Sequence, residues 1–591
     1  MTGMTSATGQ QRGWAVPLAV LIVGSFMSVL DTSIVNVAIP KIQIELGASA
    51  GDVEWVVTGY TLALGVVVPL SGWLGMRIGQ TTLYNLALAG FAVASGLCGL
   101  AWNLDTLIGF RILQAIPGGL LPVVTMTLLY RIVPTDKIGT AMGMYGLGVV
   151  FAPAVGPTLG GWLVQYIDWR LIFYINVPIG ILGTVAALAV FPRVHPTSWP
   201  KFDALGFVTV AYGLFALLLA FSKGQDWGWT GYRIEMLLVS GLLSLALFVV
   251  IELESDNPLI DMAVLKNWPF VNSLLLIAVT TAGMFTALYY IPQFLQVVQG
   301  MQALDAGLVL MPSALIMVVL MPLAGRLYDR IGARWPAVIG LLIMAYGSLL
   351  LSQMTVDTTK ESLIVWTSIR NVGTGLAMMP IMTSGISALS NSLTSSGSAM
   401  NNVMQRVSSS IAVAVFGGMV ASQQAQLMSD RGSLLRTGAQ ALPELDAAQQ
   451  QGPNGVLGIY QHLQQMVVTT SYANTFLAIA MLCAIAAALA LLLRSGAPKA
   501  PAAPAADAPT TTPAAAPIAA AAPAVAPTAA APPAAAPPAV EPEPAPEPER
   551  VSEPILVAPT AELPRWHLET PAEREARRNE EAAKAMSGVH V

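Results

Sequence analysis

Residues 69–79 read PLSGWLGMRIG, and residues 322–332 repeat this stretch as PLAGRLYDRIG. Seven of the eleven positions are identical in the two copies. Each copy follows the second long apolar stretch in a set of six, and an arginine, Arg111 or Arg370, falls in the fourth stretch of each set. Self-similarity of this kind marks a duplicated structural unit. The repeat therefore predicts two related helical bundles in one chain.

The composition indicates that these bundles lie in a membrane. Of the 591 residues, 55% are apolar and only 10% are charged, whereas a soluble protein has about 25% charged residues. The charges fall in short clusters between apolar stretches of about 20 residues, the length that crosses a bilayer core of about 30 Å. The composition excludes a secreted, nuclear or cytosolic enzyme.

Fourteen apolar stretches are predicted to be transmembrane helices. Two of them, at 203–222 and 234–252, belong to neither repeated set, so the predicted all-α plan is six plus two plus six. Repeated bundles are typical of secondary transporters, whose substrate site lies between the halves near the bilayer midplane. The stretches are 14–38, 53–74, 82–102, 106–130, 139–164, 170–191, 203–222, 234–252, 269–294, 303–325, 335–354, 362–386, 397–421 and 472–494.

The predicted domain boundaries follow from this plan. Lysine and arginine are more frequent in the segments that face the cytoplasm when both chain ends lie inside, which is the usual bias. The domains are a cytoplasmic N-terminus at 1–13, an N-terminal bundle at 14–192, a two-helix insertion at 193–266, a C-terminal bundle at 267–494 with an external loop at 422–471, and a cytoplasmic tail at 495–591.

Two segments depart from the regular pattern of apolar stretches and short connections. The external loop is too long for a simple connector and is rich in Gln and Ala, so part of it is expected to be helical. The tail is almost only Ala and Pro from Ala497 to about Pro548. A segment of this composition has too little apolar surface to form a buried core, so it is predicted to be disordered.

Several kinds of chemistry have no obvious place in this sequence. The two cysteines, Cys98 and Cys483, lie inside apolar stretches and cannot form a disulfide framework. The four histidines are too far apart to form a metal cluster. No long basic run is present to bind nucleic acid, and no phosphate-binding loop is present to bind ATP. Neither a cofactor nor a metal is expected.

Asp31 lies in the first apolar stretch, within LDTSIVNVAIP at residues 30–40. A charge near the bilayer centre costs at least about 2.5–3.5 kcal/mol, so such a residue is a functional hypothesis by default. A carboxyl that faces the bundle would hold a proton when desolvated and release it when water reaches it, which couples proton entry to motion. Alternatively, Asp31 merely hydrogen-bonds neighbouring helices or lies near the outer interface.

Arg111 lies in the fourth stretch, and Gln114 follows on the same helix face. A buried guanidinium needs an acceptor, for which a carboxylate or helix-end carbonyls would serve. Arg111 therefore either perturbs the protonatable carboxyl or acts as a fixed strut between helices. The same question applies to Arg370 and Arg406, for which the strut interpretation is favoured.

The fifth stretch is rich in small residues. Small residues let helix backbones approach closely, and a proline removes a hydrogen bond and permits a bend. This helix is therefore expected to pack tightly and still pivot. Its candidate functional residues are Gly148, Gly156, Pro157, Gly160 and Gly161.

Two further groups of residues are candidates for a gate and for a substrate cavity. Charged residues in the repeated stretch are suited to bind neighbouring helix ends and so hold the cytoplasmic face closed. Aromatic side chains suit a cavity for flat apolar compounds, although at helical spacing they more often form ordinary packing. The gate candidates are Gly72, Arg77, Gly79, Gly325, Asp329, Arg330 and Gly332. The cavity candidates are Phe26, Asn36, Tyr60, Gln114, Tyr145, Tyr289 and Phe294.

These strings resemble the major facilitator superfamily, and specifically its fourteen-helix drug:proton antiporter branch, the EmrB/QacA-like exporters. The resemblance covers about residues 14–494. It rests on LDTSIVNVAIP at 30–40 for the first helix, WVVTGY at 55–60 for the second, RILQ at 111–114 for the fourth, the antiporter motif at 148–161 for the fifth, and WR at 169–170 with NVP at 176–178 for the next.

The resemblance implies the major-facilitator fold and an exporter of amphipathic or hydrophobic compounds. Such an exporter is driven by the proton-motive force and works by alternating access, with Asp31 and Arg111 in proton coupling. Its implied location is the inner membrane, and its implied partners are a small-molecule substrate, protons and membrane lipid. In a cell with two membranes, an EmrA-like periplasmic adaptor and an outer-membrane channel are further expected partners.

The chain departs from the family pattern at two places. Met76 stands where the family usually has an acidic residue, whereas the second copy of the repeat keeps Asp329. An intact charge latch is therefore expected only in the second half, and a latch role for Arg77 is in doubt. Gln405 and Arg406 stand in reversed order relative to the usual thirteenth helix.

Two other functions stay open. One is export of a single endogenous metabolite, such as a fatty acid, siderophore or lipid. The other is a membrane scaffold that does not transport and acts through its long tail. The presence of Asp31 and of the glycine-rich fifth helix argues against a scaffold.

Overall fold

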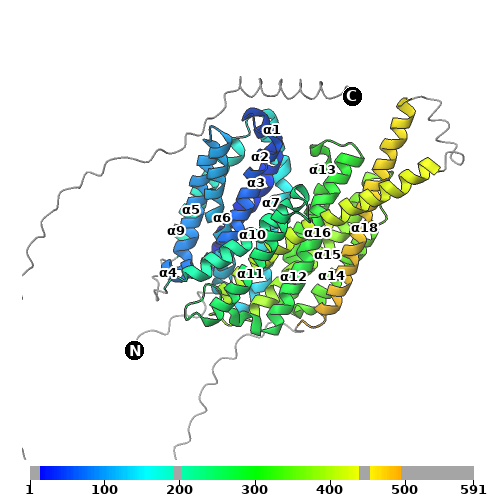
Figure 1. Cartoon of the computed structure of the whole chain (residues 1–591). Coiled ribbons are helices and arrows are strands. Elements are labelled where there is room, and N and C mark those ends of the chain that lie inside the picture. The colour runs from blue at the N-terminus through cyan, green and yellow to red at the C-terminus, as the bar shows by residue number, and fades with distance from the viewer. Residues whose placement is uncertain (1–12, 192–200, 438–452, 494–591) are drawn as a thin grey trace, which may run out of the picture. The chain divides into compact units, whose positions relative to one another are not determined.

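A computed structural model describes residues 13–191, 201–437 and 453–493, which form helices joined by short connections (Figure 1). The predictions for the tail at 495–591, and those for residues 438–452 of the external loop, lie outside the described residues. The described parts of that loop are helical, because one helix continues to Thr437 and the last begins at Pro453.

All fourteen predicted stretches overlap helices. The helices are α1 (Ala15–Glu45), α2 (Ala50–Val53), α3 (Trp55–Val67), α4 (Leu70–Ile78), α5 (Gln80–Gly99), α6 (Leu104–Ile132), α7 (Ile138–Tyr166), α8 (Leu171–Tyr174), α9 (Asn176–Val190), α10 (Ala204–Trp227), α11 (Tyr232–Glu254), α12 (Trp268–Gln293), α13 (Ala303–Ile331), α14 (Arg334–Leu351), α15 (Lys360–Ser387), α16 (Thr394–Thr437) and α18 (Pro453–Ala490). Two 3-10 helices, η1 (Thr135–Lys137) and η2 (Met262–Lys266), and one π-helix, η3 (Phe294–Val298), are also present.

The described residues contain twelve helices that are long and apolar enough to cross a membrane. The pair α3 and α4, bent by 58° at Pro69, makes a thirteenth if it is one span. The helix α15 does not pass this test, because Ser, Thr, Asn and Gly residues dilute its apolar content. The predicted all-helical membrane fold is confirmed, whereas the count of fourteen spans stays a prediction.

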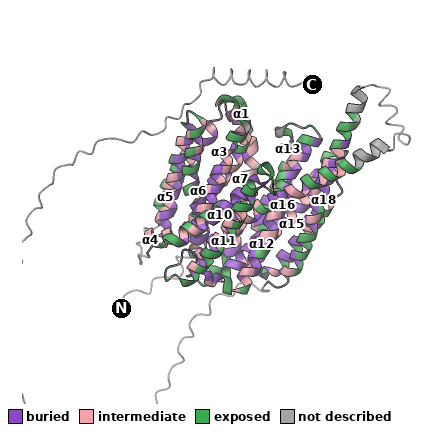
Figure 2. Cartoon of the chain, viewed as in Figure 1, coloured by how far each residue is buried: buried purple, intermediate pink, exposed green. Residues whose placement is uncertain are grey.

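The helices pack as two sets, with α10 and α11 inserted between them in sequence. In the first set, α1 packs against α6, α7 and α9, and α5 packs against α6 and α9. In the second set, α14 packs against α15 and α18, and α12 packs against α15 and α16. Buried residues line the contacts between helices, as Figure 2 shows.

The insertion contacts both sets. α10 packs against α3 of the first set and against α16 of the second. The ammonium group of Lys223 in α10 forms an ion pair with Glu54, at the start of α3, and another with Asp226 at 3.0 Å. Gln225 lies close to Gly417 of α16. The insertion is therefore placed beside the seam where the two sets meet.

The main contact between the sets is made by α7 and α13. A Cβ added to Gly325 of α13 would lie 2.8 Å from the carbonyl carbon of Gly139 and 3.2 Å from the Cα of Gly143, both in α7. Gly146 of α7 lies against the sulfur atoms of Met321 and Met379. Small residues thus bring the two helix backbones into direct contact, as is common between membrane helices.

The two copies of the repeated stretch end in the same way. Gly79 follows α4 with φ of 88°, and Gly332 follows α13 with φ of 82°. Positive φ strains a residue with a side chain but not glycine, which is why glycine often terminates helices. The sequence repeat is therefore also a repeat of local structure.

Replacing Gly325 by alanine is expected to destabilise the protein by about 1–3 kcal/mol, the usual cost of overpacking a filled contact. The added methyl group would meet the backbone of Gly139 and not the end of a flexible side chain. Gly307→Ala in the same helix is the control, because nothing lies within 4 Å of its added Cβ. Unfolding titrations of the purified protein in mixed micelles measure both variants. Equal stabilities would contradict the close packing of α7 on α13.

Candidate functional site

Asp31 lies near the middle of α1 and is 0% exposed. Its Oδ2 atom accepts a hydrogen bond from Nη1 of Arg111 in α6, and the two side chains form an ion pair. Its Oδ1 atom accepts from Nε2 of Gln114 at 2.9 Å and from Nδ2 of Asn176 in α9 at 3.1 Å. Both carboxylate oxygens therefore have partners, as a buried charge requires.

Arg111 is held by further contacts on the other side. Its Nε atom donates to the carbonyl of Val56 in α3 at 3.2 Å, and Nη1 also donates to Oε1 of Gln114 at 2.8 Å. The guanidinium carbon lies 3.8 Å from the centre of the Tyr60 ring and 5.6 Å from that of Phe173. A desolvated cation on an aromatic face gains about 2 kcal/mol. The positive charge is fixed in place.

Ser95 of α5 completes this network. Its hydroxyl oxygen accepts from Nε2 of Gln114 at 2.5 Å and from Nδ2 of Asn176 at 3.1 Å. The side-chain amide nitrogens of Gln114 and Asn176 thus each donate one hydrogen bond to Ser95 and one to Asp31. One network of side chains ties together α1, α5, α6 and α9, with α3 joined through Val56.

The structure brings together several residues that the sequence singled out separately. Asp31, Arg111, Gln114 and Tyr60 lie in one cluster, whereas their part in proton coupling stays a prediction. Sequence reasoning missed Ser95 and Asn176 as members of the network. Asn176 begins NVP, which the family resemblance includes, but an uncharged polar residue in an apolar stretch carries little signal by itself.

The glycines of α7 bring it close to α1 beside Asp31. A Cβ added to Gly156 would lie 2.6 Å from the hydroxyl oxygen of Ser33, and one added to Gly160 would lie 3.1 Å from the carbonyl oxygen of Ile34. Pro157 lies inside the helix between them. The two other motif glycines make different contacts, since Gly148 faces Ile22 and Gly161 lies more loosely near Val37.

Asp329 connects the second set to the beginning of α7. Its carboxylate accepts hydrogen bonds from the backbone N–H groups of Gly139 at 2.7 Å and Thr140 at 2.8 Å, and from the Thr140 hydroxyl at 2.6 Å. The first N–H groups of a helix lack partners within it, and a carboxylate there also complements the helix dipole. This contact crosses the seam and is suited to hold that end closed.

Of the other gate candidates, Gly325 lies at the same contact as Asp329, because it packs against Gly139, whereas Gly72, Arg77 and Arg330 do not. Gly72 packs against the carbonyl oxygen of Leu259, and the guanidinium carbon of Arg77 lies 5.3 Å from the centre of the Trp73 ring. Arg330 is exposed and has no hydrogen bond or ion pair within the described residues. Charge-assisted hydrogen bonds across the seam are therefore seen at the second copy of the repeat.

Arg370 is the counterpart of Arg111 in the second set, but its surroundings differ. Its Nη2 atom donates to the carbonyl of Gly283 in α12, and its Nη1 atom donates to the side chain of Asn371 at 3.4 Å. No carboxylate pairs with it in the described part of the chain. This arrangement fits the strut interpretation and leaves the buried ion pair in one half.

The cavity candidates do not line one cavity. Phe294 is completely buried in an apolar cluster of the second set, and Asn36 is exposed on α1. Phe26 stacks on Phe151 with ring centres 6.4 Å apart. Aromatic residues at helical spacing give no sign of which face they occupy, so the sequence could not separate core residues from cavity residues.

Tyr289 does line a recess, with a volume of about 260 Å³, formed by α10, α12, α16 and α18. Tyr289 and Tyr290 meet edge to face with ring centres 5.1 Å apart, and Tyr290 lies 5.0 Å from Tyr472. Gln225 and Gln293 add amide groups. Aromatic walls with a few polar groups are typical of small-molecule sites.

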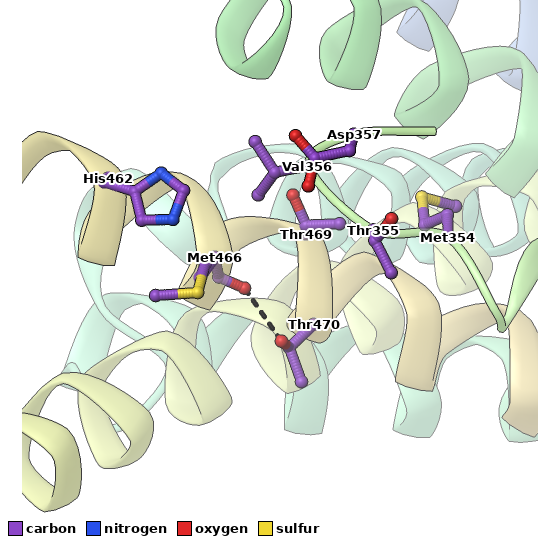
Figure 3. Close-up of a pocket in the computed structure, with 8 residues that line it drawn as sticks. All are labelled: Met354, Thr355, Val356, Asp357, His462, Met466, Thr469 and Thr470. Carbon is purple, nitrogen blue, oxygen red and sulfur yellow. Dashed lines mark hydrogen bonds between the residues drawn. The ribbon is translucent and has the colours of Figure 1, made fainter. Parts of the chain in front are cut away.

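A second recess, of about 190 Å³, lies between α18 and the connection from α14 to α15 (Figure 3). The hydroxyl of Thr470 turns back to its own helix and donates to the carbonyl of Met466 at 2.7 Å. His462 and Asp357 lie on separate walls and form no ion pair. None of the predicted site residues lines this recess.

Comparison with known proteins places these features in a family. The family model described as Major Facilitator Superfamily matches residues 21–413. The chain is 31% identical to the tetracenomycin C resistance and export protein of Streptomyces glaucescens, over 86% of this chain and 97% of that protein. It is 36% identical to the uncharacterized MFS-type transporter YhcA of Bacillus subtilis, over 68% of this chain and 77% of that one.

Further relatives agree with this assignment. The lincomycin resistance protein LmrB of Listeria monocytogenes is 30% identical over 72% of this chain and 91% of its own. Among solved structures, the proton:xylose symporter XylE matches 79% of this chain and 94% of its own, with a TM-score of 0.51 and 14% identity. The human organic anion transporter MFSD10 matches 80% of this chain and all of its own, with a TM-score of 0.52 and 12% identity. At such identities the solved structures show the fold alone.

Asp31→Ala is expected to lower the free energy of unfolding by about 3–5 kcal/mol, because it leaves Arg111 buried without a counter-charge. Combining it with Arg111→Leu is expected to cost much less than the sum of the two single changes, since the unpaired charge is gone. Asp105→Ala, at an exposed position in the first turn of α6, is the control. Unfolding titrations in mixed micelles measure all four variants, and purely additive losses would contradict the ion pair.

Proposed function

Because this chain belongs to the Major Facilitator Superfamily, whose members named above are transporters and not enzymes, we propose that it exports amphipathic or hydrophobic compounds in exchange for protons. In this proposal it is a member of the fourteen-helix EmrB/QacA-like branch. It works by alternating access in the cell membrane, the inner one where a cell has two, with both termini in the cytoplasm.

The observation that carries the proposal is the buried ion pair of Asp31 and Arg111. A protonated carboxyl gains an O–H donor and loses its charge. The attraction to Arg111 then largely disappears, while the amides of Gln114 and Asn176 can still donate to the carboxyl. The two protonation states of Asp31 therefore favour different packing of α1 against α6, which is what coupling to a proton requires.

The contacts of α7 supply a route from this site to the gate. α7 packs through Gly156 and Gly160 on α1, two and three residues beyond Asp31. Its beginning is bound by Asp329 across the seam. A shift of α1 is therefore transmitted to the contact between the two sets, because tightly packed helix backbones cannot slide independently.

The relatives and the aromatic recess support a drug-like substrate. Two relatives at about 30% identity carry names that describe tetracenomycin C export and lincomycin resistance. The recess at Tyr289 and Tyr290 has the aromatic walls that flat compounds require. In a cell with two membranes, an EmrA-like adaptor and an outer-membrane channel are proposed partners.

Asp31→Asn is expected to abolish proton-driven export, because asparagine keeps the size and hydrogen-bonding groups of the side chain but cannot titrate. The full chain in proteoliposomes with an imposed pH gradient is assayed with lincomycin, tetracenomycin C and ethidium. Proton movement is followed with a pH-sensitive dye trapped inside the vesicles. Vesicles that contain the variant are expected to show no more drug transport and no more proton movement than vesicles without protein.

Asp105→Asn is the matched control and is expected to transport like the unaltered protein. An uncoupler is expected to reduce unaltered transport to the level of the Asp31→Asn variant. Normal proton-driven export by Asp31→Asn would refute the coupling role. Export of one endogenous metabolite, with no response to any compound in the panel, would favour the alternative transporter function.

Asp329→Ala is expected to open the end of the seam that Asp329 binds, because it removes three hydrogen bonds to the beginning of α7. A cysteine replacing the fully buried Met321 reports this opening through its rate of labelling by a membrane-impermeant maleimide. Faster labelling is expected with Asp329→Ala. Arg330→Ala, at the next and exposed position, serves as the control. Equal labelling rates in the two variants would contradict a latch.

A further inference from the structure

Arg406 of α16 is a cation whose guanidinium has neither a hydrogen-bond acceptor nor an ion-pair partner among the described residues. Its Nε atom is buried and has no hydrogen-bond acceptor. Within the described residues, no other atom of its side chain takes part in a hydrogen bond or an ion pair. A guanidinium does not lose its proton in a protein, so the charge persists. The side chain is partly buried, and a charge removed from water is costly until an anion or several acceptors meet it.

Two aromatic hydroxyls interact electrostatically with Arg406, and no ion pair joins it to a carboxylate of the described residues. Its electrostatic partners are Tyr60 of α3 and Tyr145 of α7, both in the first set of helices. The side chain thus faces across the seam between the two sets. Tyr60 also interacts with Asp31 and Arg111, so one side chain connects the lone cation with the buried ion pair.

A strut does not explain this arrangement. Arg370 has the bond that a strut needs, since it donates to the carbonyl of Gly283 in a neighbouring helix. Arg406 makes no such bond to any helix that the structure describes. Its planar group instead has free N–H donors in the fork geometry that binds a carboxylate, sulfonate or phosphate through two parallel hydrogen bonds.

The face of α16 that carries Arg406 leads to the aromatic recess. Val413 and Gly417 line that recess, and they follow Arg406 by seven and eleven residues, which places all three on one side of the helix. Seven residues of helix span about 10 Å. An anion at Arg406 and an apolar body in the recess therefore fit a single amphipathic molecule.

We propose that Arg406 binds the anionic group of the transported compound, so that the substrate class is amphipathic organic anions with a flat apolar body. This inference rests on the proposed export function and specifies its substrate. The anion supplies the acceptor that Arg406 lacks, and the walls at Tyr289 and Tyr290 bind the apolar part. The bound anion lies beside Tyr60 and thus near the proton site.

The test uses two probes that differ by one charged group. They are 8-anilinonaphthalene-1-sulfonate and N-phenyl-1-naphthylamine, which has the same aromatic body and no sulfonate. Binding to the full chain in lipid nanodiscs is measured by fluorescence, with empty nanodiscs as the blank. Export is measured in proteoliposomes under a pH gradient.

Arg406→Gln is expected to weaken sulfonate binding at least about tenfold, the loss of one strong charge-assisted interaction. Binding of the neutral probe is expected to be unchanged. Arg406→Lys keeps the charge but not the planar fork, so it is expected to recover part of the sulfonate affinity. This variant also tests the inference if Arg406→Gln folds poorly. Arg334→Gln is the control, because Arg334 only donates to the carbonyl of Leu493 at 2.8 Å.

The outcomes separate this inference from the proposed function. Equal effects of Arg406→Gln on both probes, or no preference of the unaltered protein for the sulfonate, would overturn the inference. If the neutral probe is still exported in exchange for protons, the proposed function stands. Binding of the sulfonate that depends on Arg406, with no export of either probe or of the drug panel, would support anion binding at Arg406 and overturn the proposed function, and with it the claim that the bound anion is transported.

Discussion

The buried ion pair of Asp31 and Arg111 is the interaction on which the first half of this protein depends. A carboxylate in a bilayer-spanning helix is stable only with a counter-charge and with its oxygens satisfied. Arg111 supplies the counter-charge, and Gln114 and Asn176 donate to the carboxylate. Ser95 of α5 accepts hydrogen bonds from both of these amides. The need of the Asp31 carboxylate for a counter-charge and hydrogen-bond donors thus determines how α1, α5, α6 and α9 pack together.

The two halves are alike in outline but not in chemistry. The repeated stretch ends with a glycine of positive φ in both halves, yet Asp329 has no acidic counterpart at Met76. Likewise, Arg111 has a carboxylate partner, whereas Arg370 has a backbone carbonyl. One half therefore contains the buried ion pair, and the other contributes the carboxylate that binds the beginning of α7 across the seam. α7 contacts both, because Gly156 and Gly160 pack on α1 and Gly139 donates to Asp329.

Much of this arrangement could be predicted from sequence, because a bilayer imposes strong and simple rules. Long apolar stretches predict the helices, and Asp31 and Arg111 are conspicuous because charges in such stretches are costly. The apolar content of α15 is diluted by its Ser, Thr, Asn and Gly residues, of which Thr367, Thr374 and Thr383 are buried inside the protein. Ser95 and Asn176 could not be identified from the sequence, since an uncharged polar residue costs little free energy in a membrane helix and is therefore not conspicuous. The burial of Phe294 depends on which helix lies opposite, which a single sequence does not specify.

Infrared difference spectroscopy of the full chain tests the central claim most directly, because it observes the protonation state of Asp31 itself. The spectrum of the protein in lipid is compared with and without a transported compound, and the Asp31→Asn variant identifies the band of this carboxyl. The account predicts that the protonated carboxyl signal of Asp31 changes when the compound binds and that the variant lacks this change. A carboxylate that remains ionised throughout, with identical difference spectra for the two proteins, would contradict it.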